Sequence, residues 1–245
     1  MNIHAGIRKK FLRNIEANEK KHTPNREYVF YGLSITGYKG LSYGRMKFGS
    51  MIKWLSRIGF VLVFAFEIAN YFGLLHFTLD YTWLGLIVTM LGASFGIEIA
   101  DYCMRRSVGV ELPWLLWPVI FGAVFIDVVG DVFSLYSSFT WFDQVAHFLG
   151  TAAPALVFYV FFHNLQKVKG WRYPVALNLL LAFGLAMALG AFYEIEEYVE
   201  DFLAGSNRLG DGQDTANDLL LNTFGAISML AVIAVRNFFR PTSKQ

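Results

Sequence analysis

Long apolar stretches separated by short polar connections dominate the chain from residue 51 onward. Because an α-helix rises about 1.5 Å per residue, roughly 20 apolar residues cross a hydrocarbon core of about 30 Å. Six stretches reach this length, at 54–76, 82–104, 113–136, 141–165, 173–202 and 215–237. The pattern therefore predicts an all-α integral membrane protein, a six-helix transmembrane bundle over residues 51–240 in which consecutive helices are antiparallel.

Residues 1–50 differ from the rest and are predicted to form a basic N-terminal arm. Within residues 3–21, apolar positions such as Ile7 and Phe11 alternate with Lys and Arg. This mixture predicts a basic amphipathic helix on anionic lipids, or alternatively a solvated basic tail. Residues 28–50 are rich in Gly, Tyr and Ser without a clear period, which indicates a linker or an interfacial segment.

Composition supports a membrane protein and excludes several classes. Hydrophobic residues make up 55% of the 245 positions and charged residues 16%, and the mean hydropathy is +0.42. Soluble domains carry about 25% charged residues, so a water-soluble globule is excluded, as are disordered and collagen-like chains. The single cysteine, Cys103, excludes an intramolecular disulfide and a multi-cysteine zinc site. The expected partner is the lipid bilayer, with no nucleic acid, and the oligomeric state stays open.

Charge is distributed asymmetrically, which predicts an orientation. Residues 1–57 contain 12 Lys and Arg against 3 Asp and Glu, whereas residues 58–245 contain 9 against 16. Basic residues also occur in the connections after the second, fourth and sixth stretches, while the alternate connections contain only Arg208. Because cytoplasmic loops are enriched in Lys and Arg, both termini are predicted to be cytoplasmic, in a bacterial inner membrane.

Acidic residues gather at one end of the last four predicted spans, although a charge at mid-bilayer costs about 2.5–3.5 kcal/mol on insertion scales. In the predicted topology this end is extracytoplasmic. The polar residues there are Asp127, Asp131, Asp143, His147, Glu194, Glu196, Glu197, Glu200, Asp201, Asp214, Asp218 and Asn222. Many are three or four positions apart, which places them on one face of each helix. We expect these polar stripes to point away from lipid.

Crowded carboxylates repel one another unless a cation or shared protons neutralise them, so the sequence predicts either a divalent metal or shared protons. Asp143, His147 and Asp218 are the candidate catalytic residues. The candidate metal ligands are Asp143, His147, Glu194, Glu197, Asp218, Asp127, Asp131 and Asn222. Oxygen-rich ligation with one imidazole favours Mg²⁺, Mn²⁺ or Ca²⁺ over Zn²⁺.

Structural interpretations of the same acids stay open beside the chemical ones. Thr140 and Asp143 resemble a helix-capping pair, and Asp214 is predicted to be the N-cap of the sixth span. Glu196 and Glu200 are predicted to be solvated on a separate face of the fifth span. Near the cytoplasmic end of the second span, Glu98 and Asp101 are predicted to pair with Arg105 and Arg106.

The first two predicted spans contain one mid-span acid and one glycine pattern. Glu67 lies near the middle of the first span, where it is a candidate element of a proton or ion path. Gly92 and Gly96 form a G-x-x-x-G pattern, which predicts close helix packing in the second span.

Three motifs in order resemble the VanZ-like membrane proteins, and most closely the YjdF-like branch of uncharacterised inner-membrane proteins. They are the D-x-x-x-H helix start at Asp143, the acidic helix end at Glu194–Glu197, and the D-x-x-x-N-x-x-G helix from Asp218 through Asn222 to Gly225. The resemblance covers about residues 113–235. It implies that these positions belong to one site, but the basic arm and the additional first spans depart from the pattern, so no phenotype is transferred.

Three functions are compatible with this sequence. The first is a metal-assisted hydrolase or transferase acting at the extracytoplasmic face on a lipid or lipid-linked head group. The second is a transporter of protons, cations or a small solute, although no internal repeat is evident in the sequence. The third is a non-catalytic membrane scaffold whose acids hold a structural ion.

Overall fold

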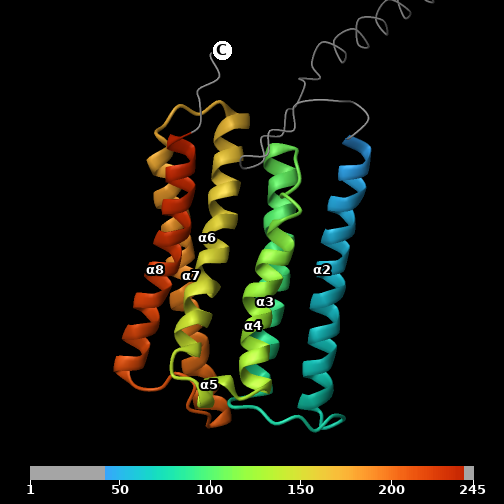
Figure 1. Ribbon diagram of the computed structural model, residues 1–245, viewed down its shortest axis with the longest axis vertical. Helices are drawn as coiled ribbons and strands as arrows, with labels where there is room; N and C mark the ends of the chain where they lie inside the picture. Colours follow the sequence, from blue (N-terminus) through green and yellow to red (C-terminus); the bar gives the residue numbers. More distant parts are fainter. Residues whose placement is uncertain (1–41, 240–245) are drawn as a thin grey trace, which may run out of the picture. The chain divides into compact units, whose positions relative to one another are not determined.

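The computed structural model describes residues 42–239, which form helices joined by short connections (Figure 1). The chain divides into two units, Met1–Arg45 and Met46–Gln245, and the packing below is that of the second unit. The helices are α2 (Ser42–Tyr71), α3 (Trp83–Val108), α4 (Leu116–Val132), α5 (Leu135–Ser138), α6 (Phe142–Lys169), α7 (Val175–Ala204) and α8 (Gly212–Phe238). Residues 42–239 contain no strand, so the predicted all-α class is confirmed for this part of the chain.

Four helices, α3, α6, α7 and α8, are long and apolar enough to cross a membrane. Their bounds lie within four residues of the predicted stretches. Large apolar side chains such as Phe95 on α3, Phe192 on α7 and Val232 on α8 point outward and are mostly exposed. An apolar surface of this kind is typical of helices that face lipid.

The first and third predicted stretches differ most from the structure. α2 begins at Ser42, twelve residues before the predicted start, so part of the predicted linker is helical. The third stretch is interrupted at Ser134, whose φ of 53° is left-handed and cannot continue an α-helix. α4 therefore has 17 residues and is followed by the short helix α5. The predicted amphipathic helix at 3–21 lies outside the described residues.

The structure corrects two predicted helix caps. Asp211, and not Asp214, is the N-cap of α8, because its side chain accepts hydrogen bonds from the backbone N–H groups of Gln213 and Asp214. α6 begins at Phe142, and its N-cap is Trp141 with no side-chain cap hydrogen bond, so Thr140 and Asp143 do not form the predicted capping pair. The carboxylate of Asp143 therefore does not cap α6.

Two glycines bring α6, α7 and α8 close together. A Cβ atom at Gly225 of α8 would lie 2.1 Å from the backbone oxygen of Phe148 in α6, and one at Gly190 of α7 would lie 2.8 Å from the side chain of Asn222. Gly92 and Gly96, by contrast, have no neighbouring heavy atom within 4 Å. The close packing predicted for the G-x-x-x-G pattern is therefore wrong within the described residues, and it occurs instead at the α6–α8 contact.

This packing places four polar segments at one end of the bundle. Figure 1 shows the start of α6, the end of α7 and the start of α8 at the same end, together with α5. The start of α6, the end of α7 and the start of α8 carry most of the acidic residues singled out in the sequence. The candidate site lies there.

Candidate metal centre

His147 is surrounded by carboxylates from three helices. Its Nε2 atom lies 3.5 Å from Asp143 Oδ1, one turn earlier on α6, and 3.7 Å from Asp218 Oδ1 on α8. Its Nδ1 atom lies 3.6 Å from Glu194 Oε1 on α7. The close contact between α6 and α8 at Gly225, two turns from Asp218, brings these side chains together.

Ligand atoms in this region are close enough to share an ion. Donor atoms of Asp143, His147 and Asp218 lie within 4.8 Å of one another, and so do those of His147, Glu194 and Glu197. These five residues are called the His147 cluster below. All of them were predicted as ligands from the sequence, and the structure brings them to one place; their binding of a metal stays a prediction.

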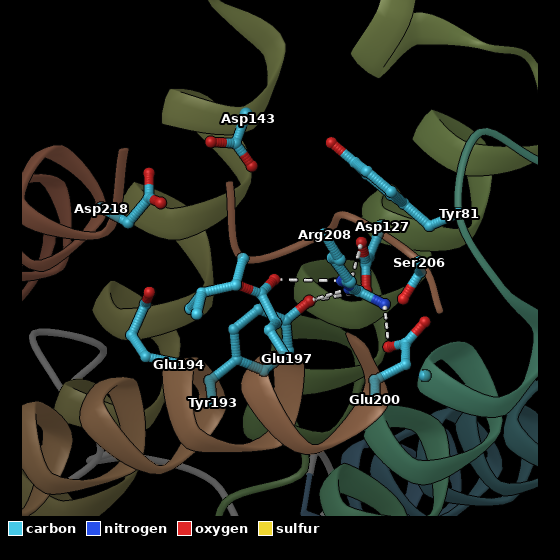
Figure 2. Close-up of polar contacts among 12 residues, drawn as sticks. Tyr81, Asp127, Asp143, Tyr193, Glu194, Glu197, Glu200, Ser206, Arg208 and Asp218 are labelled. Carbon is cyan, nitrogen blue, oxygen red and sulfur yellow. Dashed lines mark hydrogen bonds and ion pairs between the residues drawn. The ribbon is translucent and has the colours of Figure 1, made fainter. Parts of the chain in front are cut away.

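The carboxylate of Glu194 is buried without a hydrogen-bond partner. Its residue is 6% exposed, and neither Oε1 nor Oε2 accepts a hydrogen bond. Asp218 Oδ1, also buried, has none either. Figure 2 shows the Glu194 and Asp218 carboxylates reaching from α7 and α8 into the same region. Leaving a buried acceptor unsatisfied costs about 1–3 kcal/mol, so these atoms fit a bound cation.

Arg208 lies at the centre of a second polar group, the Arg208 cluster, although it comes from the connection between α7 and α8. Its guanidinium contacts Asp127 Oδ2 at 3.1 Å, Glu197 Oε1 at 3.0 Å and Glu200 Oε2 at 3.4 Å, and it also hydrogen-bonds Tyr193 (Figure 2). Burial alone would lower the pKa of Arg208, but Tyr193, Asp127 and Glu197 hold it above its ordinary value. Arg208 therefore stays charged and neutralises part of the acidic end.

Glu200 corrects one prediction. Glu200 is predicted to lie on a solvated face of α7, but it is 2% exposed, pairs with Arg208 and accepts a hydrogen bond from Thr82. No periodicity within α7 could have revealed this, because its partners come from a connection and from the start of α3. Glu196 is half-buried, and its Oε2 atom is buried without a hydrogen-bond partner, so its predicted solvation is wrong for that atom. It belongs to neither metal-ligand group.

Three predicted ligands lie beside the His147 cluster and not within it. Asp127 accepts hydrogen bonds from Tyr136 at 2.6 Å and Tyr193 at 3.1 Å in addition to its Arg208 contact. Asp131 Oδ1 accepts the backbone N–H of Tyr81 at 2.8 Å. Their oxygens thus stabilise the neighbouring connection and the Arg208 cluster.

Asn222, the third of these predicted ligands, lies two helix turns into α8 from Asp214. Its Oδ1 atom accepts a hydrogen bond of 2.5 Å from Thr151 of α6. The amide therefore links α6 to α8 near Gly225 and supports the position of His147, one turn before Thr151.

The other end of α2 and α3 carries separate ion pairs. Asp101 pairs with Arg105 at 3.1 Å, which confirms one predicted pair, and lies 3.7 Å from Lys53. Glu98 pairs instead with Arg57 of α2 at 2.6 Å, so its predicted pairing with α3 arginines is wrong. These contacts attach α2 to α3.

Comparison with known proteins shows a family but no characterised activity. Residues 52–237 match a family described as predicted membrane protein (DUF2238). An uncharacterised protein of Thermotoga maritima is 25% identical over 150 residues, which cover 59% of this chain and 77% of the relative. No solved structure matches the chain.

Proposed function

The chain belongs to the DUF2238 family of predicted membrane proteins, and we propose that it is a metal-assisted hydrolase or transferase acting on a lipid or lipid-linked head group. The reaction takes place at the extracytoplasmic face of a bacterial inner membrane. The metal is Mg²⁺, Mn²⁺ or Ca²⁺, with Zn²⁺ less favoured by the oxygen-rich donor set.

One observation carries this proposal: the two unpartnered oxygens of Glu194, buried beside His147 and Asp218. Arg208 satisfies Glu197, but its contacts do not extend to Glu194 or Asp218. The acids nearest His147 thus lack a fixed cation of their own. A divalent ion held by His147, Glu194 and Glu197 would supply the missing charge. Asp218 lies on the opposite, Nε2 side of the imidazole ring.

Asp143 is the member of the His147 cluster best suited to exchange protons. Its side chain is 30% exposed, whereas those of His147, Glu194 and Asp218 are 4–7% exposed. A general acid or base must reach both the reacting group and a proton source. When bound, the metal would polarise a phosphoryl or carbonyl oxygen or lower the pKa of a bound water. Asp143 would then take or return the proton, and His147 would orient it.

The proposed topology has six spans, with α2 and α4 added to the four apolar helices, and both termini in the cytoplasm. It rests on the basic connections at Arg105 and Arg106, at Lys167 to Arg172, and after Arg236. The order of the Asp143, Glu194 and Asp218 motifs supports a finer relationship to VanZ-like and YjdF-like proteins. We also propose that the basic N-terminal arm, residues 1–50, binds anionic lipids.

Cysteine labelling tests this orientation. Ser138→Cys and Ala204→Cys, both at exposed positions, are made in a Cys103→Ala background. Both should react with a membrane-impermeant maleimide in intact cells, because their connections face outward, whereas the matched Lys169→Cys should react only after lysis. The opposite pattern would place the His147 cluster at the cytoplasmic face.

Lipid turnover tests the enzymatic function. In proteoliposomes of total bacterial lipid with Mn²⁺, the wild type should consume a lipid species, as followed by lipid mass spectrometry. Asp143→Asn should slow that loss by about 100-fold or more, because general acid–base groups contribute factors of that size. The matched Glu111→Gln removes a carboxylate that pairs with Lys53 at the other end of the bundle, and it should retain turnover. If the wild type consumes no lipid, the enzymatic function is wrong, and a non-catalytic scaffold with a structural ion becomes the favoured function.

A proton or cation transporter is the second candidate, and Glu67 is the observation that favours it. Glu67 of α2 is 0% exposed, and neither of its oxygens accepts a hydrogen bond. For the same reason, no hydrogen-bonded path joins Glu67 to His147 among residues 42–239. The geometry of the His147 cluster therefore supports the enzyme more strongly.

A further inference from the structure

A polar cleft of about 640 Å³ opens between the start of α6 and the connection that leads into α8. Four side-chain amides line it: Gln144, Asn207, Gln213 and Asn217. Two carboxylates, Asp211 and Asp214, line it as well. The cleft is thus rich in groups that form hydrogen bonds, and its lining includes no Lys, Arg or His.

The cleft adjoins the exposed side of the His147 cluster. Gln144 directly follows Asp143 on α6, and Asn217 directly precedes Asp218 on α8. Asp214 lies one turn before Asp218, on the same face of that helix. A group seated in the cleft therefore sits beside Asp143, the partly exposed acid of the cluster.

The cleft wall is ordered by its own hydrogen bonds. Asp201 accepts bonds from Ser206 Oγ at 2.6 Å and from the backbone N–H groups of Arg208 at 2.8 Å and Leu209 at 3.0 Å. Gly210 adopts a left-handed φ of 65° before α8 begins. The amide of Asn207 is consequently presented from a fixed turn, which lowers the entropy lost on binding.

The electrostatics disfavour an anion in this cleft. A helix N-terminus ordinarily attracts anions, but at α8 the N–H groups of Gln213 and Asp214 already bond Asp211. The carboxylates of Asp211 and Asp214 add negative charge. The one basic residue of the connection, Arg208, is 6% exposed and is turned toward the Arg208 cluster.

Side-chain amides offer both donors and acceptors without charge, which suits hydroxyl groups. We infer that the cleft binds the uncharged, polyhydroxylated glycosyl part of a lipid-linked head group. The inference rests on the proposed function and names its substrate class. Trp141, the N-cap of α6 three residues before Gln144, is 54% exposed, and Phe139 is 46% exposed. Aromatic side chains of this kind favour the membrane–water interface, where such a head group lies.

The test measures binding and not turnover. The full-length protein, in a detergent without sugar and with chelator present, is titrated separately with diacylglycerol glucoside and with phosphatidic acid of the same acyl chains. Native mass spectrometry reports the bound fraction. The glucoside should bind at least about tenfold more tightly, because two or more net hydrogen bonds distinguish it from the repelled phosphate.

The double variant Gln144→Leu with Asn217→Leu should lose about tenfold in glucoside affinity. The matched Asn164→Leu, whose amide bonds the Val160 carbonyl of its own helix near the other end of α6, should bind as the wild type does. Equal binding of glucoside and phosphatidic acid, or an unaffected double variant, would overturn the inference.

This outcome is separable from that of the proposed function. Because chelator is present throughout, a preference for glucoside supports the cleft even in a protein that proves to hold no metal. If the protein binds metal and consumes lipid but shows no preference for glucoside, the enzymatic function is supported and the glycosyl-binding cleft is refuted.

Discussion

Arg208→Ala is expected to destabilise the protein by about 3–5 kcal/mol, the usual cost of removing one partner of a buried ion pair. The change leaves Asp127, Glu197 and Glu200 buried without the guanidinium that they share. Each carboxylate then faces a neighbouring carboxylate in an environment that solvates charge poorly. The thermal unfolding midpoint of the full-length protein in detergent measures the loss.

Two matched variants locate the cause of that loss. Arg106→Ala removes the same charge from an exposed position on α3 and should leave the midpoint unchanged. Arg208→Lys keeps the charge but not the planar fork that contacts three carboxylates at once, so an intermediate midpoint is expected. Equal midpoints for the wild type and Arg208→Ala would show that the Arg208 cluster does not stabilise this end of the bundle.

Gly225→Ala is expected to be the most damaging small substitution in the helix core. The added Cβ would lie 2.1 Å from the backbone oxygen of Phe148, and no side chain can rotate away to relieve that contact. α6 and α8 must separate, at a cost of about 1–3 kcal/mol or more for overpacking. The same shift moves Asp218 away from His147, and the thermal unfolding midpoint of the full-length protein should fall.

Gly184→Ala is the control for this substitution. It adds the same methyl group on α7, where no neighbouring heavy atom lies within 4 Å. Because alanine favours a helix over glycine by about 0.8–1.0 kcal/mol, its midpoint should stay the same or rise. If Gly225→Ala behaves in the same way, the contact between α6 and α8 is looser than described.

Helical periodicity predicted that the residues of the His147 cluster lie together, but it also included Asp127, Asp131 and Asn222, which lie outside both ligand groups. Asp143 and His147 lie one turn apart on α6, and the acids of α7 and α8 fall at the matching level once the spans alternate in direction. The reason is general. Exposing polar side chains to lipid costs free energy, so the polar stripe of a membrane helix faces other helices. Spacing within each span thus carried most of the information about the cluster.

Contacts that depend on connections could not be predicted in this way. The direction of Arg208 follows from the hydrogen bonds that Asp201 makes to its turn, and Glu200 is buried only because Arg208 and Thr82 reach it. The interruption at Ser134 likewise comes from one backbone angle that apolar composition does not encode.

Glycine patterns were misleading for a related reason. The G-x-x-x-G spacing of Gly92 and Gly96 satisfies a packing pattern, but in the described residues no helix lies against that face. Gly190 and Gly225 belong to no such pair and nevertheless meet Asn222 and the Phe148 carbonyl. Which small residue is needed depends on which helices meet, and that is a property of the tertiary structure.

Equilibrium binding of Mn²⁺ measures whether the His147 cluster holds one divalent cation, as we propose. The full-length protein is purified, stripped with chelator and titrated, with free Mn²⁺ followed by electron paramagnetic resonance. The wild type should bind one Mn²⁺ per chain, and Glu194→Gln should lose that binding, because the buried oxygens of Glu194 have no other partner. Glu196→Gln, on the same helix but outside both ligand groups, should bind as the wild type does. Absence of saturable Mn²⁺ binding by the wild type, or undiminished binding by Glu194→Gln, would contradict the account.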